Sequence, residues 1–163
     1  MSEAASFAFI VREFGMAVDI SWVTRRVATG AALHGPADAQ ELVALGVTHV
    51  VDLRAELDDA AYFAVTPTIA YVWNPAVDDG LPKPDAWWKV SIEFSLAALA
   101  RQHTRVYMHC AQGVNRGPST AYAILRAEGF GPLIAERLIR QVRPQVHLAY
   151  KGGADAYIHA HYE

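Results

Sequence analysis

Residues 106–120 read Val-Tyr-Met-His-Cys-Ala-Gln-Gly-Val-Asn-Arg-Gly-Pro-Ser-Thr. The residues before Cys110 have the β-branched and aromatic content of a short buried strand, and Pro118 marks the start of a helix. Gly113 lies in the loop between them and lets the backbone bend close to a ligand. Because N–H groups at a helix N-terminus point at one spot and the helix dipole adds positive charge there, this loop is predicted to bind an anion.

Two side chains of this loop indicate what the anion is. The planar fork of Arg116 can donate two parallel hydrogen bonds to phosphate oxygens, which a lysine cannot do. The helix terminus and the arginine also favour the thiolate form of Cys110, which would attack a bound phosphate monoester and form phosphocysteine. His109 is expected to orient the loop from behind. The residues expected to surround the phosphate are Ala111, Gln112, Gly113, Val114, Asn115 and Arg116.

The spacing His109-Cys110-x5-Arg116 before a helix resembles the signature of the protein tyrosine phosphatase superfamily, and within it the small dual-specificity phosphatases. Segments 22–30 and 45–54 are similar to the family's opening strand and to its next helix and strand. The resemblance covers roughly residues 20–150. It implies a cysteine-dependent phosphatase with a sheet of four or five strands surrounded by helices.

One position departs from the family pattern. The family usually places Ser or Thr directly after the arginine, where the hydroxyl stabilises the leaving thiolate, but this chain has Gly117. The departure implies slower hydrolysis of the intermediate. Ser119 or Thr120 could reach the sulfur instead, while Ser119 could equally serve as a helix-start residue after Pro118.

A general acid must protonate the leaving oxygen, and segment 73–82 supplies candidates. Asp78 and Asp79 lie there between proline and glycine residues, after one strand and before a helix. The family's acid commonly lies about thirty residues before the cysteine, which agrees with either residue; Asp78 is the first expectation and Asp79 the alternative. The alternative is that both are solvated turn residues. The acidic run 56–59 is expected to be an exposed face, and Arg54 to anchor a carboxylate or the phosphate loop.

The order of elements predicts an α/β fold with a mixed central sheet of four to five strands flanked by helices, in one domain spanning residues 1–163. Short segments rich in β-branched and aromatic residues predict the strands, and apolar residues at helical spacing predict the helices. The strands are expected at 20–27, 28–33, 47–53, 69–73 and 105–109. The helices are expected at 36–45, 85–102 and 118–128, followed by a helix that ends at about residue 142 and a last one at 154–161.

The amino-acid composition limits the kinds of binding partner and the compartment that we expect for this protein. The 14 Lys and Arg against 17 Asp and Glu give a formal charge of -3, which argues against binding nucleic acid or an anionic membrane. The apolar run 4–11 is interrupted by Arg12 and Glu13 and predicts neither a membrane span nor a signal peptide. The single cysteine agrees with a reducing compartment. We therefore expect a cytoplasmic monomer without a metal or other cofactor.

The neutral loop between Cys110 and Arg116 favours a singly phosphorylated side chain as the substrate. Phosphatases that act on inositol lipids tend to carry basic residues in this loop, and this chain has none there. Phosphotyrosine is the first expectation, with phosphoserine and phosphothreonine if the pocket is shallow. The alternatives are a phosphatase of RNA 5'-phosphate or phosphoinositide, a rhodanese-like sulfurtransferase, and a phosphate-binding module without turnover.

Overall fold

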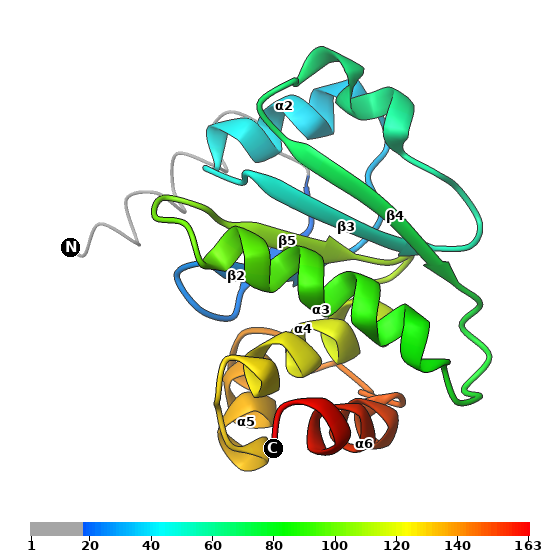
Figure 1. Cartoon of the computed structure of the whole chain (residues 1–163). Coiled ribbons are helices and arrows are strands. Elements are labelled where there is room, and N and C mark those ends of the chain that lie inside the picture. Colours follow the sequence, from blue (N-terminus) through cyan, green and yellow to red (C-terminus); the bar gives the residue numbers. More distant parts are fainter. Residues whose placement is uncertain (1–17) are drawn as a thin grey trace.

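A five-stranded mixed sheet, in the order β1-β2-β5-β3-β4, runs through the middle of the computed structural model, which describes residues 18–163 (Figure 1). Among the strand pairs of these residues, β1 and β2 are antiparallel and the others are parallel. The apolar run 4–11 lies outside the described residues. The strands are β1 (Ile20–Trp22), β2 (Val27–Gly30), β3 (His49–Arg54), β4 (Ala70–Ala76) and β5 (Val106–His109).

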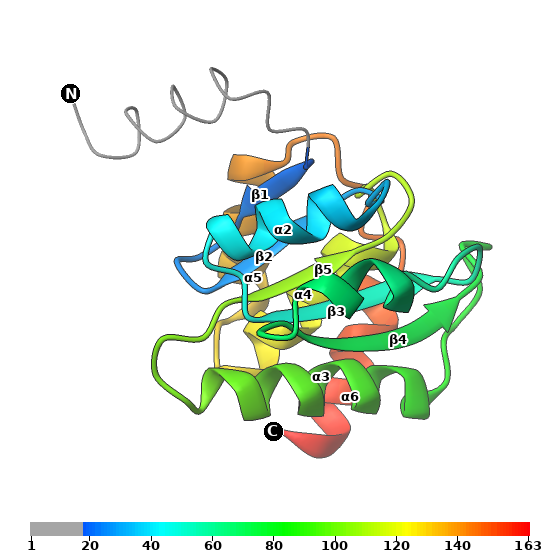
Figure 2. The ribbon, with the colours of Figure 1, turned by 90° about the horizontal axis from the view of Figure 1, so that it is seen from above.

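Helices cover both faces of the sheet. One face carries α2 and the short 3-10 helix η1, and α3 to α6 lie on the other, as the view from above shows (Figure 2). The predicted α/β class with a mixed, helix-flanked sheet is confirmed. The helices are α2 (Pro36–Ala44), η1 (Ala60–Val65), α3 (Asp85–Leu99), α4 (Arg116–Ala127), α5 (Pro132–Val142) and α6 (Lys151–His161).

Neighbouring residues of the central strands face opposite layers. Val50 and Tyr107 are paired across β3 and β5 and pack under α2, whereas Val51 and Met108, the next pair, belong to the core beneath α3 and α4. Side chains alternate along a strand, so a strand covered on both faces must be apolar at successive positions. This explains why the strand before Cys110 has no polar alternation.

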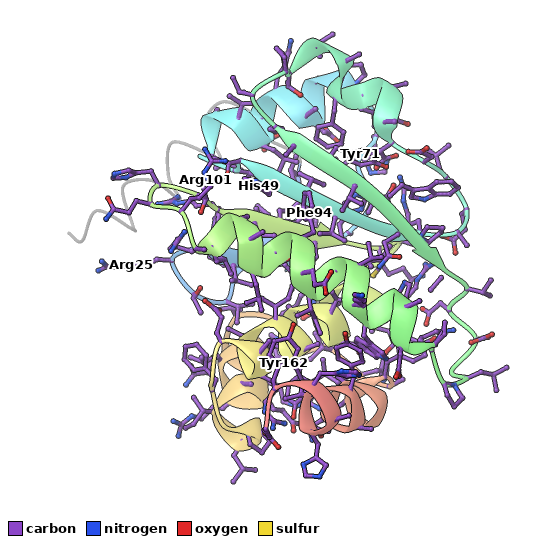
Figure 3. The ribbon with its side chains drawn as sticks, viewed as in Figure 1. Arg25, His49, Tyr71, Phe94, Arg101 and Tyr162 are labelled. Atoms are coloured by element: carbon purple, nitrogen blue, oxygen red, sulfur yellow. The ribbon has the colours of Figure 1, made fainter. Side chains whose placement is uncertain are left out.

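The long helix α3 packs against β3 and β4. His49 on β3 meets Phe94 of α3 edge-on, with ring centroids 5.5 Å apart (Figure 3). Trp87 and Trp88 are buried in the same layer. None of the helices within residues 18–163 combines the length and the apolar character needed to cross a membrane.

The first expected strand, 20–27, is not continuous: β1 covers only its first three residues, and a turn separates β1 from β2, which begins at Val27. β1 ends at Trp22, and the N–H groups of Val23 and Thr24 both donate to the carbonyl of Val27, which closes a turn. The Thr24 hydroxyl accepts from the N–H groups of Arg26 and Val27. Threonine can bond its own backbone in this way, and that local bonding competes with the strand. The segment 60–65, η1, was not expected from the sequence.

The parallel strands bring three loops to one edge of the sheet. β5 ends before Cys110, β3 ends at Arg54 and β4 ends at Ala76, and these strands are neighbours. Open α/β sheets bind ligands outside the carboxyl ends of their strands. The functional site is therefore sought at this edge.

Candidate active site

The backbone of residues 110–116, here called the phosphate loop, has four successive carbonyl groups that accept hydrogen bonds from outside the loop. The donors are the N–H of Ala32 to Ala111, the guanidinium of Arg143 to Gln112 and Gly113, and the N–H of His147 to Val114. In a trans peptide the N–H points away from the carbonyl. The N–H groups of residues 112–115 therefore face the interior of the loop, which makes a cradle for an anion.

Gly113 is required by this geometry. Its φ of 65° lies in the left-handed region, and a Cβ there would be 2.6 Å from the carbonyl carbon of Gly30 and would overlap the guanidinium of Arg143. A side chain at this position is excluded both by conformation and by space. The glycine of the sequence motif is explained by the close approach of β2 and Arg143.

Arg143 supports the phosphate loop from behind and was not identified from the sequence. The residue is 2% exposed and holds both carboxylate oxygens of Asp19 at 2.7 Å. These hydrogen bonds raise the pKa of Arg143, against the opposing effect of burial. Asp19 and Arg143 are 124 residues apart, so no local pattern could have paired them.

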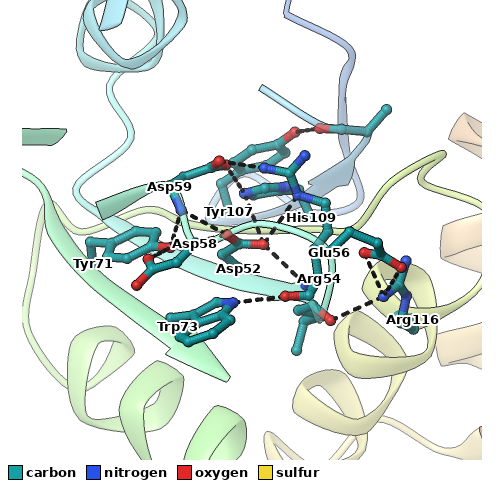
Figure 4. Close-up of polar contacts among 12 residues, drawn as sticks. Asp52, Arg54, Glu56, Asp58, Asp59, Tyr71, Trp73, Tyr107, His109 and Arg116 are labelled. Atoms are coloured by element: carbon teal, nitrogen blue, oxygen red, sulfur yellow. Dashed lines mark hydrogen bonds and ion pairs between the residues drawn. The ribbon is translucent and has the colours of Figure 1, made fainter. Parts of the chain in front are cut away.

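Cys110 and Arg116 lie at the two ends of the loop, and both are almost fully buried. The N–H of Cys110 donates to the carbonyl of Gly30 at 3.3 Å. One terminal nitrogen of Arg116 donates to the carbonyl of Ala76 at 2.7 Å. The same nitrogen pairs with Glu56 at 3.0 Å (Figure 4). The Nε of Arg116 is buried and has no hydrogen-bond partner among the described residues, so it is a donor that a phosphate oxygen could satisfy.

Glu56 is a second residue that sequence reasoning did not place in the site. Burial alone would raise the pKa of Glu56, but the hydrogen bond and the charge of Arg116 outweigh it and the pKa lies below its usual value. The side chain is about half exposed, at 54%. It fixes the far side of the guanidinium and leaves Nε free for a ligand.

Asp78 and Asp79 have different surroundings. Oδ2 of Asp78 lies 3.9 Å from Nε of Arg116, and its Oδ1 accepts hydrogen bonds from Asn115 and Tyr150. Asp79 instead binds Lys83 at 2.7 Å, and this bond lowers the pKa of Asp79. The structure therefore brings Asp78 to the phosphate loop, while Asp79, in the same exposed turn, pairs with Lys83.

Behind the loop, His109 lies in a fully buried charge cluster with Asp52, Arg54 and Asp59 (Figure 4). Its Nε2 is 3.3 Å from Asp59 and 3.7 Å from Asp52, and Arg54 binds Asp59. Burial raises the pKa of Asp52, although the charge of His109 opposes it. The expectation that the run 56–59 is an exposed face is wrong for Asp59, because Arg54 compensates its charge and allows burial.

Ligand atoms of Asp52, Asp59 and His109 lie within 4.8 Å of one another, a grouping that could hold a cation. Arg54 contacts both carboxylates and already supplies the positive charge that they need. The cluster is therefore best explained as an ion-pair network that fixes the end of β5 and with it His109.

Gly117, the departure from the family pattern, has a structural explanation. A Cβ at this position would lie 2.9 Å from the hydroxyl oxygen of Thr29 and 3.5 Å from the backbone nitrogen of Cys110. Thr29 is fully buried, and its hydroxyl has no hydrogen-bond partner within the described part of the chain. Thr29 thus fills the space that a serine or threonine at position 117 would need.

The two hydroxyls considered as substitutes lie on α4. The Ser119 hydroxyl accepts a hydrogen bond from the N–H of Tyr150 at 3.4 Å, so it helps to fix the segment after α5. The hydroxyl of Thr120 is buried and has no hydrogen-bond partner in residues 18–163.

We expect Gly117→Ser to destabilise the protein by about 1–3 kcal/mol, because the new side chain overpacks against Thr29. The double variant Thr29→Ala, Gly117→Ser should regain much of that loss, since alanine removes the hydroxyl that is in the way. Urea unfolding of the three proteins measures both effects. An unchanged midpoint for Gly117→Ser alone would show that the space is larger than the structure indicates.

Comparisons with known proteins agree with this architecture. No protein-family model matches the chain. The chain is 31% identical over 91 residues to human dual specificity protein phosphatase 13B, which is 54% of this chain and 46% of that relative. The matched part thus spans less than half of the curated relative's length.

Solved structures match over most of the chain. The crystal structure of PTPMT1 has a TM-score of 0.72 at 18% identity and covers 86% of this chain and 94% of that one. Human tyrosine phosphatase-like serine/threonine/tyrosine-interacting protein has a TM-score of 0.73 at 13% identity and covers 90% and 100%. The resemblance to the protein tyrosine phosphatase superfamily is therefore confirmed. The chain has the fold of the dual-specificity phosphatases.

Proposed function

We propose that this chain is a cysteine-dependent phosphatase that hydrolyses phosphotyrosine in proteins, with phosphoserine and phosphothreonine as further substrates. The observation that carries the proposal is the convergence of three groups at one edge of the sheet. Cys110 begins the cradle. At its end Arg116 offers an Nε that has no hydrogen-bond partner among residues 18–163, and Asp78 lies 3.9 Å from that nitrogen. A nucleophile, an anion clamp and a proton donor are the parts that this reaction needs.

The reaction has two steps. The thiolate of Cys110 attacks phosphorus, the S–P bond forms as the ester P–O bond breaks, and Asp78 gives its proton to the leaving oxygen. A water then attacks the phosphocysteine, Asp78 takes a proton from it, and the thiolate leaves. In both steps the inward N–H groups and Arg116 stabilise the charge on the three other phosphate oxygens.

The residues at the edge of the phosphate loop favour a substrate with a single phosphate. Glu56 and Asp78 are carboxylates at the loop edge, and the exposed apolar residues Leu57 and Val77 follow and precede them in sequence. Trp73, 41% exposed, donates its indole N–H to the carbonyl of Arg54 beside them. Acidic groups repel additional phosphates, whereas the apolar ones can contact an aromatic ring.

A phosphate-binding module without turnover is the second candidate. Gly117 removes the usual hydroxyl beside the sulfur, and one structural neighbour is described as tyrosine phosphatase-like and as an interacting protein. Such a module would use the same cradle and Arg116 but would bind a phosphopeptide without releasing phosphate.

The test is phosphate release in the presence of EDTA from four substrates: a phosphotyrosine peptide, a phosphoserine peptide, PI(5)P and an RNA 5'-phosphate. We expect release to be fastest from the phosphotyrosine peptide and unaffected by EDTA. Tight peptide binding without release would establish the binding module instead. Preference for PI(5)P, which is bound in a crystal structure of PTPMT1, would overturn the assigned substrate class.

A further inference from the structure

The carboxylate of Asp78 is held by two side chains from separate parts of the fold. Nδ2 of Asn115, in the phosphate loop, donates to Oδ1 at 2.8 Å, and the hydroxyl of Tyr150 donates to the same oxygen at 2.9 Å. Oδ2 is the oxygen that faces Nε of Arg116. The two oxygens of Asp78 therefore have different surroundings before any substrate is bound.

Tyr150 is fixed on several sides. The N–H of Gly80, in the turn after Asp78, donates to its hydroxyl at 3.0 Å, and Nζ of Lys83 lies 4.8 Å above its ring. Burial raises the pKa of Tyr150, which the Gly80 hydrogen bond opposes and the one to Asp78 reinforces. The phenol is therefore neutral and able to donate at physiological pH.

Asn115 ties the same turn to the phosphate loop and to the segment before α6. Its Oδ1 accepts from the N–H of Ala149 at 2.7 Å, which orients the amide so that Nδ2 faces Asp78. The N–H of His147 bonds the carbonyl of Val114 at 2.9 Å. Segment 147–150 is thus bonded to the phosphate loop through His147 and Ala149, and to Asp78 in the neighbouring turn through Tyr150.

We propose that Asn115 and Tyr150 are positioning residues that hold the turn carrying Asp78, residues 77–83, over the phosphate loop and direct its proton. Both are donors to Oδ1, so the transferable proton of Asp78 resides on Oδ2, the oxygen on the phosphate side. The leaving oxygen takes that proton as the P–O bond breaks, and the water of the second step restores it. This inference deepens the proposed function and rests on it.

The kinetic test compares Tyr150→Phe with the matched control Tyr162→Phe, which removes a hydroxyl from an exposed tyrosine at the end of α6. On phenyl phosphate, whose leaving group needs a proton, we expect Tyr150→Phe to lower kcat about 5- to 30-fold with little change in KM. On 2,4-dinitrophenyl phosphate the change should be under about threefold. In an Asp78→Ala background, Tyr150→Phe should cause no further loss.

Equal losses on both esters, or a further loss in the Asp78→Ala background, would show that Tyr150 acts through packing and would overturn the proposal. If the wild-type chain turned over neither phenyl phosphate nor 2,4-dinitrophenyl phosphate, the proposed function would instead be refuted. The positioning can then be tested without activity, by amide hydrogen exchange of residues 77–83.

Asn115→Ala removes no partner of the Gly80 N–H, yet it should speed exchange at Gly80 about tenfold, because the turn opens more often. Tyr162→Phe should leave that exchange unchanged. If Asn115→Ala does not change exchange anywhere in residues 77–83, Asn115 does not hold the turn and the proposal is wrong.

Discussion

Cys110→Ser should reduce phosphate release to the background rate, while affinity for a phosphotyrosine peptide should stay within about threefold of wild type. A serine hydroxyl is not ionised near neutral pH and cannot replace the thiolate as nucleophile. The cradle, by contrast, consists of backbone N–H groups and Arg116, which the substitution does not touch. Phosphate release from the peptide measures the loss of turnover, and calorimetry with the same peptide measures the retained affinity.

The substitution is conservative in volume, but Cys110 is 2% exposed, so stability must be measured beside activity. An unchanged thermal midpoint with lost turnover assigns the effect to chemistry. Because the chain has a single cysteine, a thiol reagent that inactivates the wild type must act at Cys110. Residual turnover in Cys110→Ser above about one per cent of wild type would require another nucleophile.

The phosphate loop could be predicted from the sequence because its information is local. The strand, Cys110, the bend at Gly113 and Arg116 lie within about a dozen residues, and each has a physical requirement for its residue type. The parallel arrangement of the strands follows from the alternation of strands and helices. Together they predict where the loop lies in the fold.

The supports of the loop could not be predicted because they connect distant parts of the chain. Tyr150 and Asp78 are 72 residues apart, and Arg143 and Asp19 are 124 apart. Tyrosine and arginine are ordinary at exposed positions, and only tertiary packing buries Tyr150 and Arg143. Asp59 was misassigned for another reason: its partner Arg54 is only five residues away, but an acidic run does not indicate which of its carboxylates turns inward to that partner.

The choice between Asp78 and Asp79 also required the tertiary structure, because adjacent residues of a turn share the same local sequence. Asp78 faces Arg116 and receives the hydroxyl of Tyr150, whereas Asp79 pairs with Lys83 in the same turn. The Asp79 carboxylate is exposed and pairs with Lys83 rather than with the phosphate loop, so Asp79 can serve as a matched control.

Asp78→Asn should lower kcat/KM for phenyl phosphate by about 10²- to 10⁴-fold, because asparagine has no proton to give to the leaving oxygen. The loss on 2,4-dinitrophenyl phosphate should be under about tenfold, since that leaving group departs as an anion. Asp79→Asn should stay within about threefold of wild type on both esters, as expected for an exposed carboxylate tied to Lys83.

The pH dependence provides an independent check on the same pair. For wild type and Asp79→Asn, kcat on phenyl phosphate should fall as pH rises through the range in which the acid loses its proton, and Asp78→Asn should lack this alkaline limb. A limb that persists in Asp78→Asn and disappears in Asp79→Asn would transfer the acid role to Asp79. That result would also mean that the turn of residues 77–83 rearranges when substrate binds, since in the structure Asp79 pairs with Lys83 and Asp78 is the residue that faces Arg116.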